Sequence, residues 1–174
     1  MASETGTNGS DTLDHFGDTG PGTLIGLAGD DCIFTGSGAW TATGDSGLDT
    51  IVLRTGNTGS IVGGSENDSI FSADQVGALS LFGNSGNDVI DVRHATGNLT
   101  IAGGDDSSDG ADNIFSGSGN DLIFGNGGND VIFSNFFVGN DSDTVVGGAG
   151  DDLISRSDNS GNDLVLGNEG NDDL

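Results

Sequence analysis

A nine-residue frame repeats along the chain, and it constrains the fold more than any other feature of the sequence. The frame runs Gly-x-x-Gly-x-Asp and then three residues with an apolar residue at their centre. The clearest copies are GLAGDDCIF (26–34), GNSGNDVID (83–91), GNGGNDVIF (125–133) and GGAGDDLIS (147–155). Repetition at a short fixed period is typical of solenoids, in which each repeat packs only on its neighbours.

An apolar residue follows two positions after the Asp of every copy, although only 32% of the sequence is hydrophobic. These residues are Leu13, Ile33, Ile51, Ile70, Ile90, Ile114, Ile123, Ile132, Val145, Ile154, Val165 and Leu174. A short strand that buries one side chain after a Gly-rich turn is what a coiled parallel sheet requires. The pattern therefore predicts parallel strands, each with one inward residue.

The frame is similar to the GGxGxDxUx nonapeptide of the RTX (repeats-in-toxin) family, and its copies extend from Gly6 to Leu174. The resemblance implies an all-β fold, a right-handed parallel β-roll of about nine coils in which two nonapeptides make one coil. It also implies Ca²⁺ ions held between the turns of successive coils. We therefore expect a single RTX-like domain over residues 1–174.

The spacing of the frame Asp residues predicts two different turn edges. Successive frame Asp residues lie 18 to 20 residues apart as far as Asp88, which is one full coil, and about half a coil apart from Asp112 onward. One edge then carries Asp11, Asp31, Asp49, Asp68, Asp88, Asp112, Asp130, Asp152 and Asp172, and the other carries Asp121, Asp143 and Asp163. Residues 6–102 are thus expected to hold Ca²⁺ on one edge and residues 103–174 on both.

Ca²⁺ takes six to eight oxygen ligands and commonly combines carboxylates with backbone carbonyls. We expect the frame Asp residues to supply the carboxylates and turn glycines to supply carbonyls, among them Gly26, Gly83, Gly125, Gly127, Gly147 and Gly167. Loops longer than the frame add candidate ligands at Asp105, Asp106, Asp109, Asp141 and Asp158. About ten ions would neutralise most of the formal charge of −25.

Strands without a preceding frame Asp complete the N-terminal coils. They are TLI (23–25), TAT (41–43), SIV (60–62), SLF (80–82) and TIA (100–102), each with an apolar centre. The turns on this second edge contain His15, Arg54, Arg93 and His94, which we interpret as partial substitutes for absent Ca²⁺. A transition-metal site is disfavoured because the two His residues lie about four coils apart.

The charge balance excludes several function classes. With 28 acidic residues against three Arg and no Lys, the chain offers no basic patch to nucleic acid and no attraction to anionic membranes. Composition alone would suit a disordered chain, but the acids recur at fixed offsets from Gly. No apolar run reaches transmembrane length, and no N-terminal signal peptide is seen, so we expect no membrane insertion.

Catalysis finds no support in the sequence. The carboxylates recur along the chain instead of converging on one cleft, and no Ser-His-Asp grouping is present. Cys32 is the sole cysteine, and Asp30 and Asp31 beside it disfavour a reactive thiolate. We therefore expect a protein that is not an enzyme.

Apolar residues also occupy the outward position after each inward one. They are Phe34, Val52, Phe71, Phe115 and Phe133 on one face, and Ile25, Val62, Phe82, Phe124, Val146 and Leu166 on the other. Same-face stacking explains such ladders as well as contact with a partner does. Together with unprotected coils at both ends, they lead us to expect homo-association, lateral or head-to-tail.

The leading functional hypothesis is an extracellular, calcium-binding structural module that folds on Ca²⁺ and self-associates in a filament, surface layer or matrix. The alternative is a repeat segment that serves the folding and secretion of a larger toxin, protease or adhesin. An ice-binding roll ranks third, because the array of Thr23, Thr41, Ser60, Ser80 and Thr100 is interrupted by Leu122. Open sites of this kind bind Ca²⁺ at about 10⁻⁴ to 10⁻³ M, which indicates an extracellular or cell-surface location.

Overall fold

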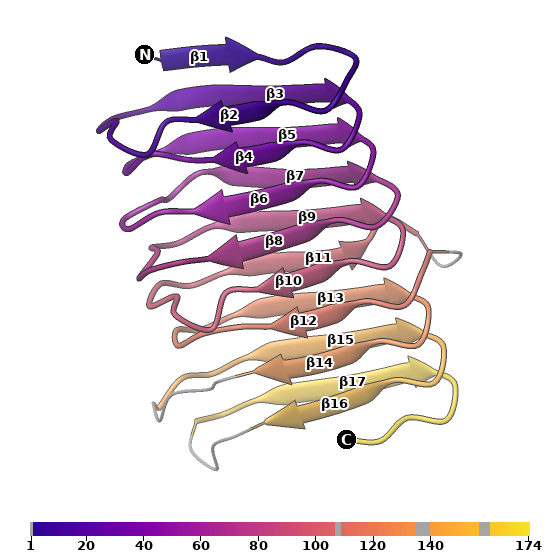
Figure 1. Ribbon diagram of the computed structural model, residues 1–174. Helices are drawn as coiled ribbons and strands as arrows, with labels where there is room; N and C mark the ends of the chain where they lie inside the picture. Colours follow the sequence, from indigo (N-terminus) through magenta and orange to yellow (C-terminus); the bar gives the residue numbers. More distant parts are fainter. Residues whose placement is uncertain (1, 107–108, 135–139, 157–160) are drawn as a thin grey trace.

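The computed structural model describes residues 2–106, 109–134, 140–156 and 161–174. Within these ranges the regular elements are β-strands, stacked coil upon coil from the N-terminus at the top of Figure 1 to the C-terminus at the bottom. None of the residues described forms a helix that could cross a membrane. The predicted all-β roll of parallel coils is confirmed.

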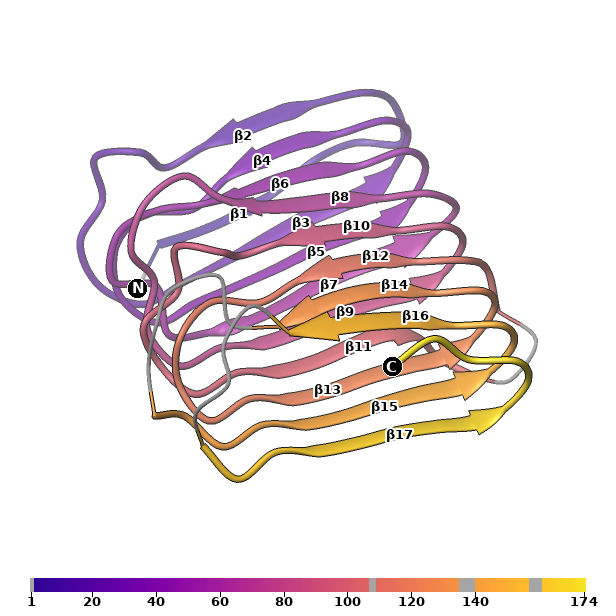
Figure 2. The same cartoon turned by 90° about the horizontal axis from the view of Figure 1, so that it is seen from below.

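The strands form two sheets that face each other, the odd-numbered strands in one layer and the even-numbered strands in the other (Figure 2). The first sheet contains β1 (Ala2–Thr5), β3 (Gly22–Ala28), β5 (Trp40–Ser46), β7 (Ser60–Ser65), β9 (Ser80–Ser85), β11 (Thr100–Gly104), β13 (Leu122–Gly127), β15 (Thr144–Ala149) and β17 (Leu164–Glu169). The second sheet contains β2 (Thr12–Asp14), β4 (Cys32–Phe34), β6 (Thr50–Leu53), β8 (Ser69–Ser72), β10 (Val89–Asp91), β12 (Asn113–Phe115), β14 (Val131–Ser134) and β16 (Leu153–Arg156).

Each strand pairs in parallel with the same strand of the next coil. Ile33 of β4, for example, lies between Leu13 and Ile51, and Ile101 of β11 lies between Leu81 and Ile123. The nonapeptide frame therefore sets the register directly, because the inward residue always meets its own equivalent.

The inward residues make a single narrow core. Those predicted from Leu13 to Ile154 are all buried, and so are the centres of the Asp-free strands, including Ala42 and Ile61. Val165, in the last strand of the stack, is only half-buried, and Leu174 is 66% exposed. The sequence pattern thus located the core residues that lie in the middle of the strands, but not the buried residues beside the turns such as Trp40 and Leu79.

The outward residues form two columns on each sheet. The first-sheet face consists of Ser3, Thr23, Thr41, Ser60, Ser80, Thr100, Leu122, Thr144 and Leu164, beside Thr5, Ile25, Thr43, Val62, Phe82, Ala102, Phe124, Val146 and Leu166. The second-sheet face consists of Thr12, Cys32, Thr50, Ser69, Val89, Asn113, Val131 and Leu153, beside Asp14, Phe34, Val52, Phe71, Asp91, Phe115, Phe133 and Ser155.

The two ladders of apolar residues fall in these columns, and part of one ladder stacks ring on ring. The rings of Phe115 and Phe133 lie 5.5 Å apart and are parallel to within 2°. Asp91 interrupts the second-sheet ladder, and Thr43 and Ala102 interrupt the first.

Candidate metal sites between the coils

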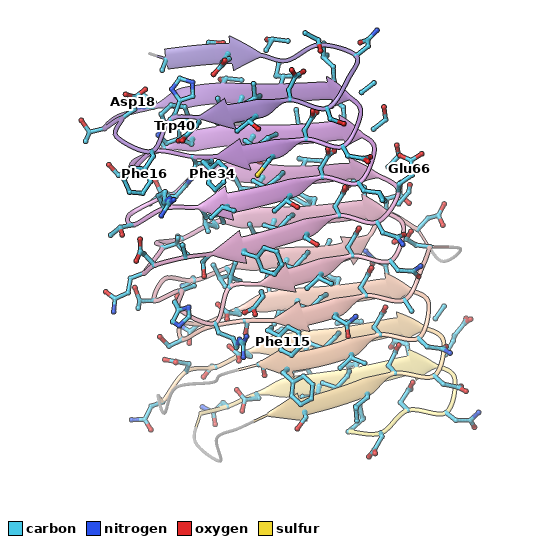
Figure 3. All side chains as sticks on the ribbon, in the orientation of Figure 1. Phe16, Asp18, Phe34, Trp40, Glu66 and Phe115 are labelled. Atoms are coloured by element: carbon cyan, nitrogen blue, oxygen red, sulfur yellow. The ribbon has the colours of Figure 1, made fainter. Side chains whose placement is uncertain are left out.

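The first edge consists of the turns that lead from a first-sheet strand to a second-sheet strand; Glu66 marks it in Figure 3. The nine frame Asp residues predicted for this edge form one unbroken ladder. In each pair, the backbone N–H of one frame Asp donates to Oδ1 of the frame Asp one coil later, from Asp11 to Asp172. The N···O distances run from 2.7 Å for Asp88 and Asp112 to 3.1 Å for Asp152 and Asp172. The carboxylates are therefore fixed in orientation by the turns themselves.

The second oxygen of these carboxylates is buried and has no hydrogen-bond partner among the described residues. This holds for Oδ2 of Asp31, Asp49, Asp68, Asp88, Asp112, Asp130 and Asp152. An unpaired buried carboxylate oxygen is costly, because it gives up its hydration without replacement. A row of such atoms is what a column of bound cations would satisfy.

The first Gly of the frame leaves space beside that oxygen. A Cβ built on Gly26 would meet Asp31 Oδ2 and lie 2.6 Å from the carbonyl oxygen of Gly44 in the next coil. Gly125 repeats this arrangement with Asp130 and the Gly147 carbonyl. Each cradle is thus lined by a carboxylate oxygen and a backbone carbonyl from the neighbouring coil, which are the hard oxygen ligands that Ca²⁺ prefers.

The other predicted glycines fall into two groups. Gly83 and Gly147 form the same cradle with Asp88 and Asp152, whereas the Cβ position of Gly167 meets only the Asp172 side chain. Gly127 instead ends β13, where it pairs with Ala149, two residues beyond the cradle at Gly125.

Burial shifts the acidity of the frame Asp residues in the protein without metal. Desolvation, with repulsion from neighbouring carboxylates, raises the pKa of Asp49 and Asp88 to about 6 and that of Asp68 and Asp130 to about 7. The pKa of Asp112 rises to about 8 for the same reasons. The backbone N–H donated to each carboxylate opposes the shift without cancelling it. The column therefore needs either protons or cations to be stable.

A second ladder runs in the opposite direction beside the first. The side-chain oxygen of the residue before the frame Asp accepts the backbone N–H of the next coil, as Asn67 does from Asn87 and Asn129 does from Asp151. The Asn residues of the frame therefore join successive coils, and the two ladders together fix the spacing of the turns.

The second edge, marked by Asp18 and Trp40 in Figure 3, carries a shorter ladder. The backbone N–H groups of Leu99, Asp121 and Asp143 donate in turn to Oδ1 of Asp121, Asp143 and Asp163, each at 2.9 Å. Oδ2 of Asp121 is buried and has no hydrogen-bond partner among the residues that the structure describes, and desolvation raises the pKa of Asp121 to about 7. The same carboxylate arrangement therefore recurs on this edge in the C-terminal coils.

Comparison with known families agrees with this geometry. A family model for the RTX calcium-binding nonapeptide repeat matches residues 5–39, 16–51, 80–92, 106–138, 137–155 and 157–174, which together cover most of the chain. The chain belongs to the RTX calcium-binding nonapeptide repeat family. No curated protein and no solved structure matches it.

The RTX turns differ from metal sites built of clustered side chains. Among the residues the structure describes, no three His, Cys, Asp or Glu side chains gather in a way that could hold an ion. Each cradle instead has a carboxylate oxygen from a frame Asp and a backbone carbonyl from the neighbouring coil, so a coordination shell for Ca²⁺ would need oxygens from successive coils. A single residue of the motif therefore does not identify a candidate metal site, whereas the register of successive coils does.

Apolar side chains replace the Asp column in the N-terminal coils of the RTX roll. The strand register places Trp40, Leu79 and Leu99 at the positions that Asp121 and Asp143 occupy further along, and all three are buried. The Trp40 indole lies against the preceding coil at Gly22, where a Cβ would collide with its ring. Leu53, Val76 and Val92 are also buried on the side of this edge.

Apolar side chains, and not the second-edge cations, occupy the positions of the missing Asp residues; that these cations partly substitute for Ca²⁺ by lowering the negative potential stays a prediction. Arg54 lies outside, 4.0 Å above the ring of Phe16, which is 60% exposed. Arg93 pairs with Asp91 and lies 5.4 Å above Phe115. These guanidinium groups cover exposed aromatic rings instead of the turn interior.

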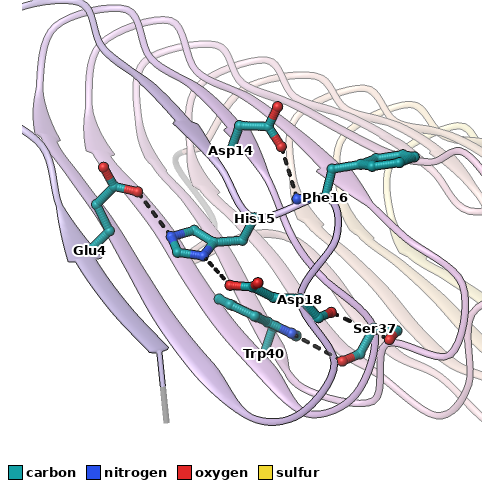
Figure 4. A network of polar contacts seen from close by, with 7 residues as sticks. All are labelled: Glu4, Asp14, His15, Phe16, Asp18, Ser37 and Trp40. Carbon is teal, nitrogen blue, oxygen red and sulfur yellow. Dashed lines mark hydrogen bonds and ion pairs between the residues drawn. The ribbon is translucent and has the colours of Figure 1, made fainter.

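His15 joins the first coil to the second edge (Figure 4). Its Nδ1 lies 2.7 Å from Asp18 Oδ2 and its Nε2 lies 2.9 Å from Glu4 Oε2, while the ring lies 5.1 Å from that of Trp40. The hydrogen bond to Asp18 and the nearby carboxylate charges raise the pKa of His15. Both ring nitrogens face carboxylates, so His15 is an ion-pairing residue here.

The acids of the longer loops are placed beside the turns. Asp109 Oδ1 accepts the Gly86 N–H at 2.9 Å, and Asp141 Oδ2 accepts the Gly119 N–H at 3.0 Å. Asp105 is exposed, whereas Asp158 lies outside the described residues. Oδ2 of Asp109 is buried without a partner in the described structure, next to Gly104. Asp109 and Asp141 therefore stabilise turns that depart from the six-residue frame.

Proposed function

We propose that this chain is an extracellular, calcium-binding structural module that folds when Ca²⁺ occupies the cradles between its coils, and that it self-associates. The observation that carries the proposal is the column of buried, unpartnered Oδ2 atoms on the first edge, each facing a glycine cradle. Ca²⁺ in these cradles would supply the missing partner and offset a formal charge of −25.

The proposed ligands are the twelve frame Asp residues, nine on the first edge and three on the second, with carbonyls of the cradle glycines. On this basis residues 6–102 hold ions on one edge and residues 103–174 on both, with about ten ions in total. Because the unfolded chain brings none of these ligands together, the free energy of binding is free energy of folding.

Calcium removal tests the proposal. The far-UV circular dichroism of the chain should show β-structure in millimolar Ca²⁺ and a largely disordered chain after excess EGTA, with recovery when Ca²⁺ is restored. Isothermal titration then counts the ions. A spectrum that EGTA leaves unchanged would contradict calcium-dependent folding.

The self-association part has its own measurement. Size-exclusion chromatography of the Ca²⁺-loaded chain, followed by electron microscopy, should reveal dimers or larger assemblies. A chain that folds on Ca²⁺ but stays monomeric would favour the alternative role, a folding and secretion segment of a larger secreted protein.

One observation supports an ice-binding role and another opposes it. Thr23, Thr41, Ser60 and Ser80 do lie in one outward column, as a regular hydroxyl array requires. The same column continues through Leu122 and Leu164, which are 37% and 50% exposed, so the array is not maintained along the roll.

A further inference from the structure

The two central columns of the first-sheet face contain no charged residue, in a chain with 28 acidic residues. The two columns of nine residues contain Ser, Thr, Ala and large apolar side chains. The nearest outward carboxylate is that of Asp45 at the first-edge end of β5, which accepts a hydrogen bond from the Thr43 hydroxyl at 2.8 Å. Carboxylates also occur at the rim of the face, where Asp106 and Glu169 line a hollow beside Val146. An apolar centre with a charged rim is the usual anatomy of a protein–protein contact.

The second-sheet face is different. Its columns carry the carboxylates of Asp14 and Asp91, and the guanidinium groups of Arg54 and Arg93 lie over its rings. Charged groups therefore lie over Phe34 and Phe115 of this face. The two central columns of the first-sheet face, by contrast, contain no charged residue.

The exposed apolar side chains of the first-sheet face are concentrated in its C-terminal coils, and smaller or more buried apolar residues alternate with Thr and Ser toward the N-terminus. Leu122, Leu164 and Leu166 are 37%, 50% and 42% exposed, and Val62 and Phe82 are half-buried. Nine strands about 4.8 Å apart give a face about 40 Å long and about 15 Å wide, or about 600 Å². Two such faces would bury about 1,200 Å² in total, which is the lower limit of a standard stable interface.

We propose that the first-sheet face binds the same face of a second copy of this chain. This rests on the proposed function and deepens it, because it assigns the surface of self-association. Strong net negative charge repels two copies wherever carboxylates oppose each other, so the two uncharged columns of this face are where the copies approach at least electrostatic cost. Stacked sheets about 10 Å apart would interdigitate the Ser/Thr column with the apolar column.

The symmetry of such a pair gives Phe82 a special place. A contact between identical faces is isologous, with a two-fold axis through its middle. β9 is the central strand of the nine, and Phe82 is its outward aromatic residue. An axis through β9 places Phe82 of one copy opposite Phe82 of the other.

Charge substitution tests this arrangement. In Phe82→Glu, two carboxylates would oppose each other at the axis, and sedimentation velocity in Ca²⁺ should show association weakened by at least about tenfold. Phe82→Thr is a second variant without added charge, since Thr43 already occupies the same column, and it should also weaken association. Phe71→Glu is the matched control: Phe71 is outward and half-buried on the opposite sheet, and its variant should associate like wild type.

Each other result has a defined meaning, provided circular dichroism in Ca²⁺ shows that the variants are folded. Phe82→Glu that associates as tightly as wild type overturns the assignment of this face and leaves self-association standing. If Phe71→Glu weakens association as much as Phe82→Glu does, the contact lies on the second sheet, and the assignment of the first-sheet face is again overturned. A wild-type chain that remains monomeric at every concentration removes self-association itself, while calcium-dependent folding is judged separately by EGTA.

Discussion

Leu27 has a left-handed backbone, with a φ of 85°, which is unfavourable for a bulky side chain. The strand register aligns it with Asp45, Asn84, Asn126 and Asn168, whose φ angles lie between 73° and 78°. Asp and Asn tolerate this conformation because their short polar side chains bond the local backbone. Leu27 is thus strained at a place where the other coils use suitable residues.

Replacement of Leu27 by Asn should therefore stabilise the Ca²⁺-loaded roll. The expected gain is about 1 kcal/mol, seen as a higher melting temperature by differential scanning calorimetry. Leu48→Asn is the control, since Leu48 is 54% exposed on the same edge and lacks a positive φ. A Leu27→Asn variant that melts below wild type would show that the Leu27 side chain contributes more by packing than its backbone loses.

Gly26→Ala addresses a single cradle. The added Cβ would clash with Asp31 Oδ2 and lie 2.6 Å from the Gly44 carbonyl oxygen, in the space assigned to an ion. We expect the loss of one Ca²⁺ per chain by isothermal titration and a loss of about 3 kcal/mol in stability. Gly17→Ala is the control, because nothing lies within 4 Å of its Cβ position, and an unchanged Ca²⁺ count in Gly26→Ala would contradict the assignment.

At the scale of the element, the second edge closes its turns by two means. Trp40, Leu79 and Leu99 close it with apolar contacts, and Asp121 and Asp143 close it with carboxylates. The two meet where the Leu99 N–H donates to Asp121 Oδ1. We therefore expect the N-terminal coils to depend on Ca²⁺ along one edge and the C-terminal coils to depend on it along both.

The sequence predicted the strands better than the turns for a physical reason. An inward residue such as Ile90 repeats at a fixed offset from Asp88, so its direction follows from strand alternation alone. The inward direction of Trp40 and Leu79 depends on the conformation of irregular turns, which no period reveals. One sequence feature could have predicted it: Trp40, Leu79 and Leu99 each directly precede an Asp-free strand, at the position that the frame Asp occupies in other repeats.

Leu99→Ala and Asp121→Asn should separate the two kinds of closure. Removal of the buried Leu99 side chain leaves a cavity and should cost about 3 kcal/mol in denaturant unfolding, even with Ca²⁺ in large excess. Asp121→Asn removes a charged ligand, so its deficit should shrink as Ca²⁺ rises. If excess Ca²⁺ rescued Leu99→Ala as well, the apolar column would not be an independent source of stability.

At the scale of the whole molecule, folding requires that the charge of the carboxylates be neutralised. The formal charge of −25 opposes any compact state, and the frame Asp residues concentrate part of it in two buried columns. Ca²⁺ is the neutralising ion proposed for the columns. Protons are a second possibility, and the raised pKa values identify the frame Asp residues that would bind them.

Acid should therefore partly replace Ca²⁺ in folding the metal-free chain. The pKa values of Asp49, Asp68, Asp112 and Asp130 in the folded roll, about 6 to 8, lie above the ordinary value of 3.8. A group whose pKa is raised by folding binds more protons in the folded state, so its contribution to stability is fully present below about pH 4 and disappears as pH rises through about 6 to 8.

In Ca²⁺-free buffer, circular dichroism should therefore show more β-structure at pH 5 than at pH 8.5. At saturating Ca²⁺ the order should reverse or vanish, because protons then compete with the ion for the same oxygens. A metal-free chain equally disordered at both pH values would mean that protonated columns do not suffice to hold the coils together.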